Sequence, residues 1–435
     1  MGGPGTWGAF PHALLMDELM HAPISVQQPE PKGAKTGAAA IRSLYVHAPF
    51  CSRRCFYCDF AVKVAPPDAD EWLRALALEV RALEQEGEFN LDSSLDTIYV
   101  GGGTPSLLGW SAMDGLARVV GEERLRGSDL EWTVEANPES FTEDVARGWR
   151  RAGVTRVSLG VQTFHGPSLR WMGRMHGAEG ARSAVRIARE AGLNNISIDL
   201  VFGLPSYLGR DWEYDLSQTL ALEVDHVSLY GLTVESKTPL GRAVKQGRET
   251  LPTDQRCAEE YLFAVERLTE AEFEAYEISN FARMDQLSQH NMIYWSGRPY
   301  LGVGNGAHSY KHPVRRWNFR DWDVYRAEVH KFTPPLEGEE TLGEDESRLE
   351  RIWLGLRSWR GLSVEGFPYA AEKRVRRWLD SGFGIEKDGV LRLTPRGWLV
   401  IDRLTVELDG DFHRALTGSG FKSDLPVRLE QFPDI

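Results

Sequence analysis

The sequence predicts an α/β protein, with a partial (β/α)6 parallel barrel followed by a smaller C-terminal α+β, winged-helix-like domain. Short apolar runs alternate with helical patterns between residues 43 and 231, which is typical of a parallel sheet with helices outside it. A helix, helix, hairpin pattern follows near the C-terminus. Three cysteines come directly after the first apolar run, at the predicted carboxyl edge of the sheet, where α/β folds bind their ligands.

The barrel elements follow from the period of the apolar residues. Apolar runs bounded by glycine or polar residues predict strands at Ser43–Phe50, Thr97–Gly101, Trp132–Glu135, Arg156–Gln162, Asn195–Phe202 and His226–Gly231. Helical periodicity between these runs predicts helices at Asp70–Glu86, Ser111–Val120, Thr142–Ala152, Ala178–Ala191 and Trp212–Leu222. Strands that alternate with helices in this way form a parallel sheet.

Four regions are expected along the chain: a flexible N-terminal extension, the barrel core, a post-barrel α/β segment and a mostly helical C-terminal domain, at 1–40, 41–240, 241–335 and 336–435. In the extension, which is rich in Gly, Pro and Ala, Ala13–Met20 is expected to form one or two helical turns. The charged, loop-like stretch around Lys237–Pro252 is expected to close the barrel. The post-barrel elements are expected from about Thr253 to Trp322, followed by an acidic link near Leu336–Glu346.

The C-terminal domain has a recognisable pattern of its own. Ser347–Leu408 reads as helix, helix and the short hairpin Gly384–Leu393. This is the order of a winged helix, which by itself says nothing about DNA binding. Three arginines, Arg374, Arg376 and Arg377, are expected to form a solvated helix face.

The bulk composition limits the possible functions. At 435 residues, with 42% hydrophobic and 26% charged residues, the chain is an ordinary globular protein with room for two or three domains. Its net charge of −13 argues against nucleic-acid binding as a main activity, and no apolar run reaches the length of a membrane span. Four cysteines, three of them clustered, make no disulfide framework, so a reducing, cytoplasmic compartment is expected.

The cysteine triad is the most specific motif. Cys51, Cys55 and Cys58 are spaced C-x-x-x-C-x-x-C, whereas Cys257 lies far away in the sequence. Three thiolates on a tight loop can hold three irons of a 4Fe–4S cluster and leave the fourth iron open for chemistry. The alternative is a structural zinc site completed by Cys257 or a histidine, although no second C-x-x-C pair is present. Cys257 is otherwise expected to be an ordinary buried thiol.

Glycines and single polar residues stand at other strand ends. Gly101–Pro105 holds three consecutive glycines, which let a backbone approach a ligand closely, whereas a tight turn needs only one or two. Glu135 and Gln162 end strands, Asp199 lies inside one, and Arg174 falls in a later loop. Together these side chains are expected to form a polar rim around one ligand. For Asp199 alone, a hydrogen-bonded structural role is equally open.

The cysteine triad, the preceding Tyr45–Phe50 and the following Gly101–Pro105 together resemble the radical S-adenosylmethionine superfamily. The resemblance extends over roughly Ile41 to Trp322 and is greatest to the oxygen-independent coproporphyrinogen III oxidases and their haem-chaperone relatives. It implies a barrel of the radical S-adenosylmethionine type, with a 4Fe–4S cluster on Cys51, Cys55 and Cys58. S-adenosylmethionine would bind the open iron, and one electron would cleave it to a 5′-deoxyadenosyl radical. By position, the implied contacts to S-adenosylmethionine are Tyr45, Gly103, Thr104, Glu135, Gln162, Arg174 and Asp199, and Tyr57 offers a face for adenine.

Two features favour the haem-chaperone group. The decarboxylating oxidases carry one more cysteine two positions after the third, and Phe60 stands at that position here. The run His290–Trp295 resembles the H-N-x-x-Y-W signature of the chaperones. This resemblance implies that His290 ligates haem iron and that Tyr294 and Trp295 pack on the porphyrin, with His308 as a second candidate ligand. The alternative is that the aromatic residues belong to the core.

The sequence thus predicts a haem chaperone that carries a 4Fe–4S cluster and S-adenosylmethionine and passes haem to an acceptor protein. A flavodoxin-like protein is expected as the electron donor. The first rival is coproporphyrinogen III oxidase activity, against which Phe60 argues. The other rivals are a radical enzyme acting on RNA, disfavoured by the net acidity, and a zinc-stabilised adaptor.

Overall fold

The computed structural model describes residues 41–417. The predicted extension 1–40, with its helical turns at Ala13–Met20, lies outside the described residues, as do the last residues of the predicted C-terminal domain. Residues 41–417 belong to one compact unit.

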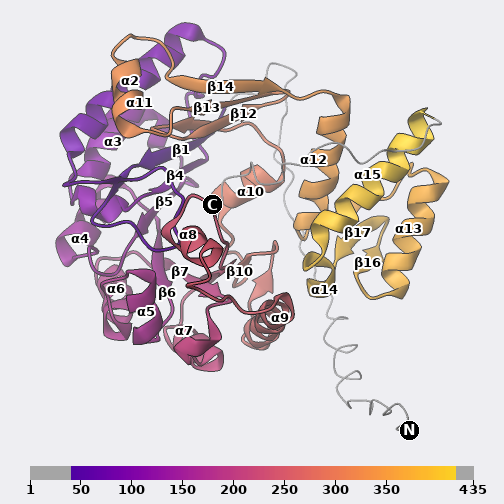
Figure 1. Ribbon diagram of the computed structural model, residues 1–435. Helices are drawn as coiled ribbons and strands as arrows, with labels where there is room; N and C mark the ends of the chain where they lie inside the picture. Colours follow the sequence, from indigo (N-terminus) through magenta and orange to yellow (C-terminus); the bar gives the residue numbers. More distant parts are fainter. Residues whose placement is uncertain (1–40, 418–435) are drawn as a thin grey trace. The chain divides into compact units, whose positions relative to one another are not determined.

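The central element is a nine-stranded sheet in the order β11-β1-β4-β5-β6-β7-β8-β10-β9 (Figure 1). Its six predicted strands pair in parallel, each with the next in the sequence. Their bounds are β1 (Ser43–Ala48), β4 (Thr97–Gly102), β5 (Glu131–Ala136), β6 (Arg156–Gln162), β7 (Asn195–Phe202) and β8 (His226–Gly231). β11 and β9 end the sheet on opposite edges, so the barrel is partial, as predicted.

Helices cover the outside of this sheet (Figure 1). The predicted helices are found at α2 (Ala69–Glu86), α3 (Ala112–Val120), α4 (Glu143–Ala152), α6 (Ala178–Glu190) and α7 (Trp212–Ala221). Side-chain oxygens of Asp68, Thr142 and Asp211 accept backbone N–H groups at the starts of α2, α4 and α7, which explains where these helices begin. A further helix, α5 (Gly166–Met172), was not predicted because it is only two turns long.

The main core lies between the sheet and these helices. Trp72 of α2, Trp132 of β5 and Trp149 of α4 are completely buried there. Every residue of β6 is buried, as expected for a parallel strand with neighbours on both sides and helices over one face. The burial of large aromatic side chains makes this layer the principal source of stability.

The post-barrel segment completes the same sheet at both edges. α9 (Asp254–Glu270) leads into β9 (Glu274–Ala275) and β10 (Asn280–Ala282), and β10 pairs antiparallel with β8. The chain then returns to the opposite edge through α10 (Gln289–Trp295). There β11 (Leu301–Val303) pairs in parallel with β1. The strand that carries the cysteine loop is therefore an inner strand of the sheet.

A second, antiparallel sheet follows. It contains β12 (His308–Lys311), β13 (Val314–Asn318) and, after α11 (Trp322–Val329), β14 (Leu336–Thr341).

The prediction that Leu336–Glu346 is an acidic link is wrong. Its first half is a strand whose glutamates face arginines of β13, with Arg315 Nη1 2.8 Å from Glu340 Oε1 and Arg316 beside Glu339. These cross-strand charge pairs replace the apolar alternation that strand prediction relies on. The second half of the segment begins the next helix.

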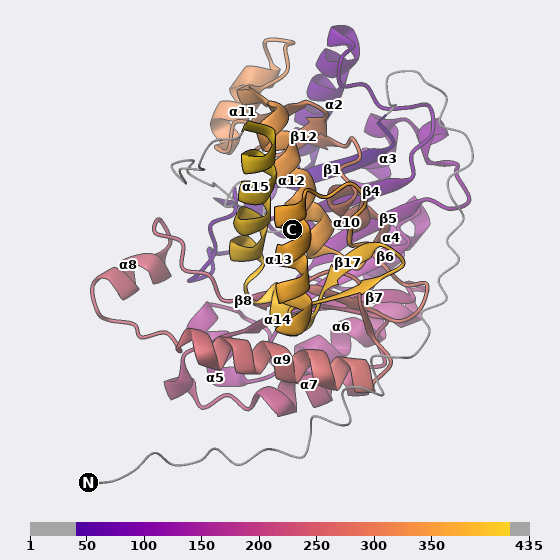
Figure 2. The same cartoon turned by 90° about the vertical axis from the view of Figure 1, so that its right-hand side faces the viewer.

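The C-terminal elements follow the predicted order helix, helix, hairpin. They are α12 (Glu344–Arg357), β15 (Leu362–Ser363), α13 (Tyr369–Asp380), β16 (Gly384–Lys387), β17 (Val390–Leu393), α14 (Pro395–Trp398) and α15 (Ile401–Thr417). The predicted hairpin has the observed bounds, and positive φ angles at Asp388 and Gly389 form its turn. Figure 2 shows α12, α13 and α15 side by side.

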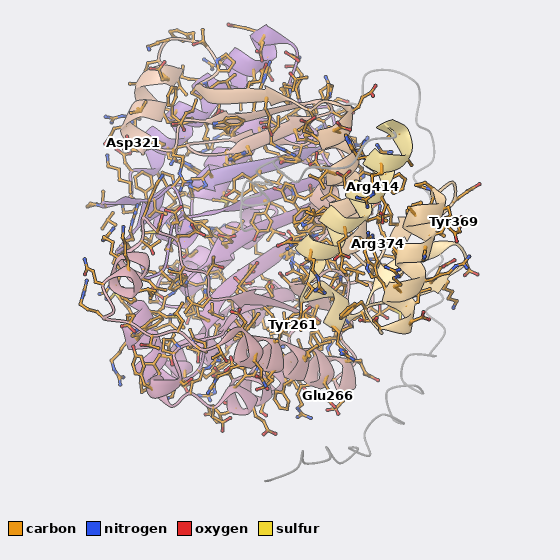
Figure 3. The ribbon with its side chains drawn as sticks, turned by 45° about the vertical axis from the view of Figure 1, so that its right-hand side comes forward. Tyr261, Glu266, Asp321, Tyr369, Arg374 and Arg414 are labelled. Carbon is orange, nitrogen blue, oxygen red and sulfur yellow. The ribbon has the colours of Figure 1, made fainter. Side chains whose placement is uncertain are left out.

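The predicted solvated arginine face is wrong for one of its three residues. Arg374 of α13 pairs with Asp411 and, at 3.1 Å, with Glu407 of α15, and Figure 3 labels it on the side of α13 that faces this helix. Arg376 and Arg377 are exposed, as predicted.

The predicted charged loop around Lys237–Pro252 contains a short helix, α8 (Pro239–Lys245), capped by the Thr238 hydroxyl. Its seven residues are too few for a periodic pattern to show. Within residues 41–417, no helix combines the length and the apolar character needed to cross a bilayer.

Candidate functional site

The cysteines occupy a loop that starts where β1 ends. Two short strands, β2 (Phe50–Cys51) and β3 (Lys63–Val64), pair in parallel and close this loop at its base. The Lys63 N–H donates to the Pro49 carbonyl at 2.7 Å, and the Phe56 N–H donates to the Met172 carbonyl of α5 at 3.1 Å. The loop is thus held between the first strand and the helix after β6.

The three thiols are partly exposed on this loop. The Cys58 sulfur accepts the Phe60 N–H at 3.4 Å, and the Cys51 sulfur lies 3.5 Å from the Thr104 hydroxyl. Burial raises the pKa of the Cys58 thiol to about 11 and shifts the pKa of Cys51 in the same direction. A positively charged group, such as the irons of a cluster, would hold these sulfurs as thiolates.

The arrangement of the thiols differs from that of a mononuclear zinc site. Nowhere in residues 41–417 do three His, Cys, Asp or Glu side chains stand close enough to share one metal ion. Sulfurs that bind different irons of one cubane are spread more widely than sulfurs around a single ion. Three thiols on one loop are the donor set that a cluster with one open iron needs.

The three glycines after β4 pack against the cysteine loop. A Cβ on Gly101 would lie 2.7 Å from Glu135 Oε1, one on Gly102 would overlap the His47 ring, and one on Gly103 would lie 2.7 Å from the Ala48 carbonyl oxygen. Each glycine is therefore needed, and this accounts for a run longer than a turn requires.

The hydrogen bonds of the glycine loop decide which of its backbone groups a ligand can use. The N–H groups of Gly102, Gly103 and Thr104 donate to Glu135, to Ala48 O (2.7 Å) and to Phe50 O (2.8 Å). These bonds fix the backbone just before Cys51. The groups the loop can present to a ligand are carbonyl oxygens, which accept hydrogen bonds from an ammonium group.

Solvent reaches the inner face of the barrel at a few positions only. Apart from terminal residues of β7 and β8, the residues of β1, β5, β7 and β8 are buried except Tyr45, Glu135, Asp199 and Tyr230, which are partly exposed. Three of these four are predicted site residues. They mark a polar opening in the interior of the barrel beside the cysteine loop.

The two acids of this opening are electrostatically coupled. Tyr99 donates its hydroxyl to Glu135 at 2.8 Å, and Ser158 donates its hydroxyl to Asp199 at 2.9 Å. Burial, assisted by the charge of Asp199, raises the pKa of Glu135 to about 7, and burial raises that of Asp199 to about 6. A cationic ligand between the two acids would favour their ionised forms.

A cation faces the acids across the opening. Arg174 Nη1 donates to Asn137 Oδ1 at 2.5 Å, and its Nη2 lies 3.4 Å from the Tyr57 hydroxyl, whereas its Nε has no partner within residues 41–417. Burial by itself lowers the pKa of Arg174, but Tyr57 and the Cys55 thiol outweigh this and hold the pKa above its usual value. The guanidinium is therefore charged and has a donor left for an anionic group.

Gln162 joins this arrangement at the end of β6. A Cβ on Gly160 would lie 3.1 Å from the Gln162 amide nitrogen, 3.2 Å from Asn137 Oδ1 and 3.6 Å from Arg174 Nη2, so the three side chains converge. Gln162 has a φ of 67°, a left-handed conformation that non-glycine residues adopt uncommonly.

Asn137 is the residue of this set that sequence reasoning missed. Its Nδ2 also donates to the Thr104 hydroxyl at 3.1 Å, so it connects Arg174 to the side chain beside Cys51. The signal that could have found it is its place directly after the end of β5, next to Glu135.

An apolar cluster lies beside the polar groups. Met172, Val201 and Leu204 are buried together, with partly buried Tyr57, Trp171, Leu208, Tyr230 and Leu232 packed against them. Two acids, one arginine, a tyrosine face and this apolar cluster match the parts of S-adenosylmethionine, which has an amino acid end, a sulfonium and an adenine. The residues present therefore fit this cofactor.

The predicted haem residues of the H-N-x-x-Y-W run are directed into the protein. His290 is completely buried, with Nδ1 2.8 Å from the Thr97 hydroxyl and Nε2 2.9 Å from the Tyr294 hydroxyl. Burial lowers the pKa of His290 to about 3, so its ring is neutral. Because both ring nitrogens are engaged, the implied role of His290 as an iron ligand does not match this conformation.

The other residues of the run connect the barrel to the C-terminal elements. Trp295 is buried against Trp353 of α12, and the Arg357 guanidinium lies 4.3 Å from the Trp295 ring centre. Asn291 Oδ1 and Trp295 Nε1 are buried with no hydrogen-bond partner within the described part of the chain.

The two remaining candidate ligands, His308 and Cys257, lie on other elements of the fold. His308 stacks on Trp317 with ring centres 6.0 Å apart, and its Nδ1 has no hydrogen-bond partner among residues 41–417. Cys257 is half-buried on α9 beside Gly203, and within residues 41–417 it belongs to no group of three possible metal ligands.

Comparison with known proteins identifies the family. The Radical SAM superfamily matches residues 45–217. Heme chaperone HemW of Mycobacterium tuberculosis is 35% identical over 372 residues, which cover 84% of this chain and 94% of the relative. Heme chaperone HemW of Bacillus subtilis is 35% identical over 339 residues, which cover 77% of this chain and 88% of the relative. The chain belongs to the HemW group of the radical SAM superfamily.

The HemW group is also the one that Phe60 and the H-N-x-x-Y-W run predicted, whereas the cysteine triad predicted the superfamily. A solved structure, coproporphyrinogen III oxidase (HemN) from Escherichia coli, superposes with a TM-score of 0.71 over 86% of this chain and 91% of that chain. At 22% identity this likeness shows the shared fold alone. The side chain that replaces the oxidase cysteine, Phe60, is 44% exposed next to Cys58.

Proposed function

We propose that this HemW-group chain binds haem and transfers it to an acceptor protein, while carrying a 4Fe–4S cluster with exchangeable S-adenosylmethionine. The observation that carries the proposal is the match at 35% identity, over 94% of its length, to a protein named as a haem chaperone. Phe60, in place of the oxidase cysteine, supports the same choice.

In this proposal the cluster is held by Cys51, Cys55 and Cys58. The bound S-adenosylmethionine supplies a source of radicals when it takes up an electron. The chain's own residues orient it: the glycine-loop carbonyls and Glu135 receive its ammonium group, Arg174 its carboxylate, and Tyr57 its adenine. Tyr45, Gly103, Thr104, Gln162 and Asp199 complete the set of contacts.

For the haem cargo we propose the segment His290–Trp295, with His308 as a second candidate ligand. Buried polar atoms without partners cost about 1–3 kcal/mol each, and Asn291 and Trp295 both carry one. A segment that served only to pack the core could avoid this free-energy cost by using apolar residues. To reach iron, His290 has to give up its hydrogen bond to Tyr294, whereas His308 has a nitrogen that needs no such exchange.

Haem titration of the purified, cluster-loaded protein tests the proposal. Absorbance should saturate at one haem per chain. His290→Phe and His308→Ala identify the ligand, since the responsible variant should lose about tenfold or more in affinity. His330→Ala is the matched control, because the His330 side chain is 60% exposed. The absence of saturable haem binding, with the cluster intact, would end the proposal.

An anaerobic assay with coproporphyrinogen III, S-adenosylmethionine and a reductant tests the rival activity, which the shared fold motivates. No protoporphyrinogen IX is expected. Its formation would replace the chaperone proposal with an oxidase.

A further inference from the structure

The charges around the cysteine loop are distributed unevenly. One set of cations is neutralised by carboxylates: Lys63 Nζ lies 2.6 Å from Asp323, and Arg320 lies 3.5 Å from Asp59. A second set, Arg53 and Arg54, contacts only the backbone carbonyls of Gly173 (3.4 Å) and Val62 (3.3 Å) with its side chains.

Helix α8 adds more cations to this second set. The Leu240 N–H donates to the Phe56 carbonyl at 2.9 Å, which fastens the start of α8 to the cysteine loop. Lys237, Arg242 and Lys245 are exposed on and before this helix. Figure 2 shows α8 projecting from the neighbouring elements, so its side chains are open to an approaching protein.

These five residues, Arg53, Arg54, Lys237, Arg242 and Lys245, are named the basic face. No ion pair within residues 41–417 includes any of them. Among nearby acids, Glu235 already has an interaction partner, and Glu249 accepts hydrogen bonds from Trp171 and Tyr207. A concentration of unpaired cations stands out on a chain whose net charge is −13.

The basic face also contains an apolar residue. Met175 is 58% exposed in the loop after α5, two residues from the carbonyl that Arg53 contacts. A small apolar spot within a charged surface is typical of weak, short-lived complexes between redox proteins.

We propose that the basic face is the docking surface for an acidic protein that donates one electron to the cluster. The inference rests on the proposed function, because it requires a cluster on Cys51, Cys55 and Cys58. Arg53 and Arg54 lie between two of these cysteines in the sequence, so a protein bound there comes as near to the cluster as the chain allows. The donor loses one electron and the cluster gains one, passing from the 2+ to the 1+ state.

Electrostatic steering explains why the face is placed at the cluster. Opposite charges raise association rates by about 10-fold to 1,000-fold, and salt weakens this effect. The net negative charge of the chain repels an acidic donor, whereas the basic face attracts it locally. Productive encounters are thereby directed to the site where the electron is needed.

The test compares two charge-reversal variants of the full, cluster-loaded chain. Lys237→Glu with Lys245→Glu alters the basic face at side chains that make no hydrogen bond or ion pair within the described residues. Arg376→Glu with Arg377→Glu makes the same change of charge on exposed residues of α13. The probe is reduced flavodoxin, an acidic one-electron carrier, mixed rapidly with each protein while cluster absorbance is followed. Its binding in the oxidised state is measured by calorimetry.

At low salt the Lys237/Lys245 variant should be reduced about 10-fold more slowly than wild type and should bind the probe more weakly. Its rate should also depend less on salt. The Arg376/Arg377 variant should match wild type within about twofold. Iron content and reduction by dithionite should be the same in all three proteins.

The outcomes separate the two proposals. Equal rates and equal binding for both variants, with loaded and dithionite-reducible clusters, would overturn the docking face and leave the proposed function standing. A chain that takes up no iron would overturn the proposed function and, with it, the electron route.

Discussion

We expect that Gly103 cannot be replaced by a larger residue, because an added Cβ would overlap neighbouring backbone atoms. In Gly103→Ala, the new Cβ would lie 2.7 Å from the Ala48 carbonyl oxygen, 2.8 Å from that of Phe50 and 2.9 Å from the Pro49 carbonyl carbon. All three atoms are backbone of the strand that leads into Cys51. Because backbone in the middle of a sheet cannot yield as the tip of a side chain can, the two segments must separate.

The expected cost has two parts. Forcing a methyl group into a packed interior costs about 1–3 kcal/mol. Separation also weakens the hydrogen bond from the Gly103 N–H to Ala48 O, now 2.7 Å long, which contributes about 0.5–1.5 kcal/mol. The free energy of unfolding should therefore fall by about 2–4 kcal/mol. The contact between the Thr104 hydroxyl and the Cys51 sulfur should be lost with it.

The assay is urea unfolding followed by circular dichroism, together with the iron content after anaerobic reconstitution. Gly177→Ala is the matched control, because Gly177 has an ordinary φ of −102° and nothing lies within 4 Å of its added Cβ. The control should change stability by at most about 1 kcal/mol, because Gly177 stands at the N-cap of α6, where alanine is less favoured, and it should keep its iron. If Gly103→Ala proves no more costly than Gly177→Ala and binds iron equally well, the role given to the glycine run is wrong.

The structure also predicts the effects of three further substitutions on stability. Burial raises the pKa of Glu79 to about 7, so the folded state holds a proton more tightly than the unfolded state. The contribution of Glu79 to stability is then fully present below about pH 4 and is lost, by on the order of 3 kcal/mol, as the pH rises through about 7. Glu79→Gln should lack this part of the pH dependence of the urea midpoint, and a pH profile equal to that of the wild type would contradict the assignment. Trp295→Ala should lower the free energy of unfolding by about 3–5 kcal/mol with or without haem, since the ring packs on Trp353; a loss seen only with haem would disprove the packing role. Asp321→Ala removes the cap of α11 and should cost about 1 kcal/mol in thermal unfolding, whereas a neutral result would show that the cap is dispensable.

The sequence was sufficient for the strands of the barrel because their signal is local. β6, β7 and β8 have the predicted bounds, since each is a run rich in apolar and β-branched residues between turns. β11 could not be found in this way. Its three residues become a strand only through pairing with β1, more than two hundred residues earlier in the chain.

Charged elements were the other source of error. The glutamates of β14 are stabilised by arginines of a neighbouring strand, and Arg374 by acids of α15. From its own sequence, each of these charged segments is predicted to be exposed to solvent, because the oppositely charged residues lie on another element. Long-range ion pairs leave no periodic mark in a single sequence.

At the candidate site, the sequence indicated which residues lie near one another, but it did not indicate which way each side chain points. Spacing along successive strands was enough to bring Glu135, Asp199 and Arg174 to one opening. It could not show that His290 turns inward to Thr97 and Tyr294, because that depends on how α10 crosses the end of the sheet.

The most direct measurement is electron paramagnetic resonance of the anaerobically reconstituted, reduced protein, before and after addition of S-adenosylmethionine, with metal analysis of the same sample. Four irons per chain and a cubane signal that changes when the cofactor is added are expected, and Cys51→Ala should abolish the signal. Zinc in place of iron, or a cubane signal indifferent to the cofactor, would contradict an open iron on this loop.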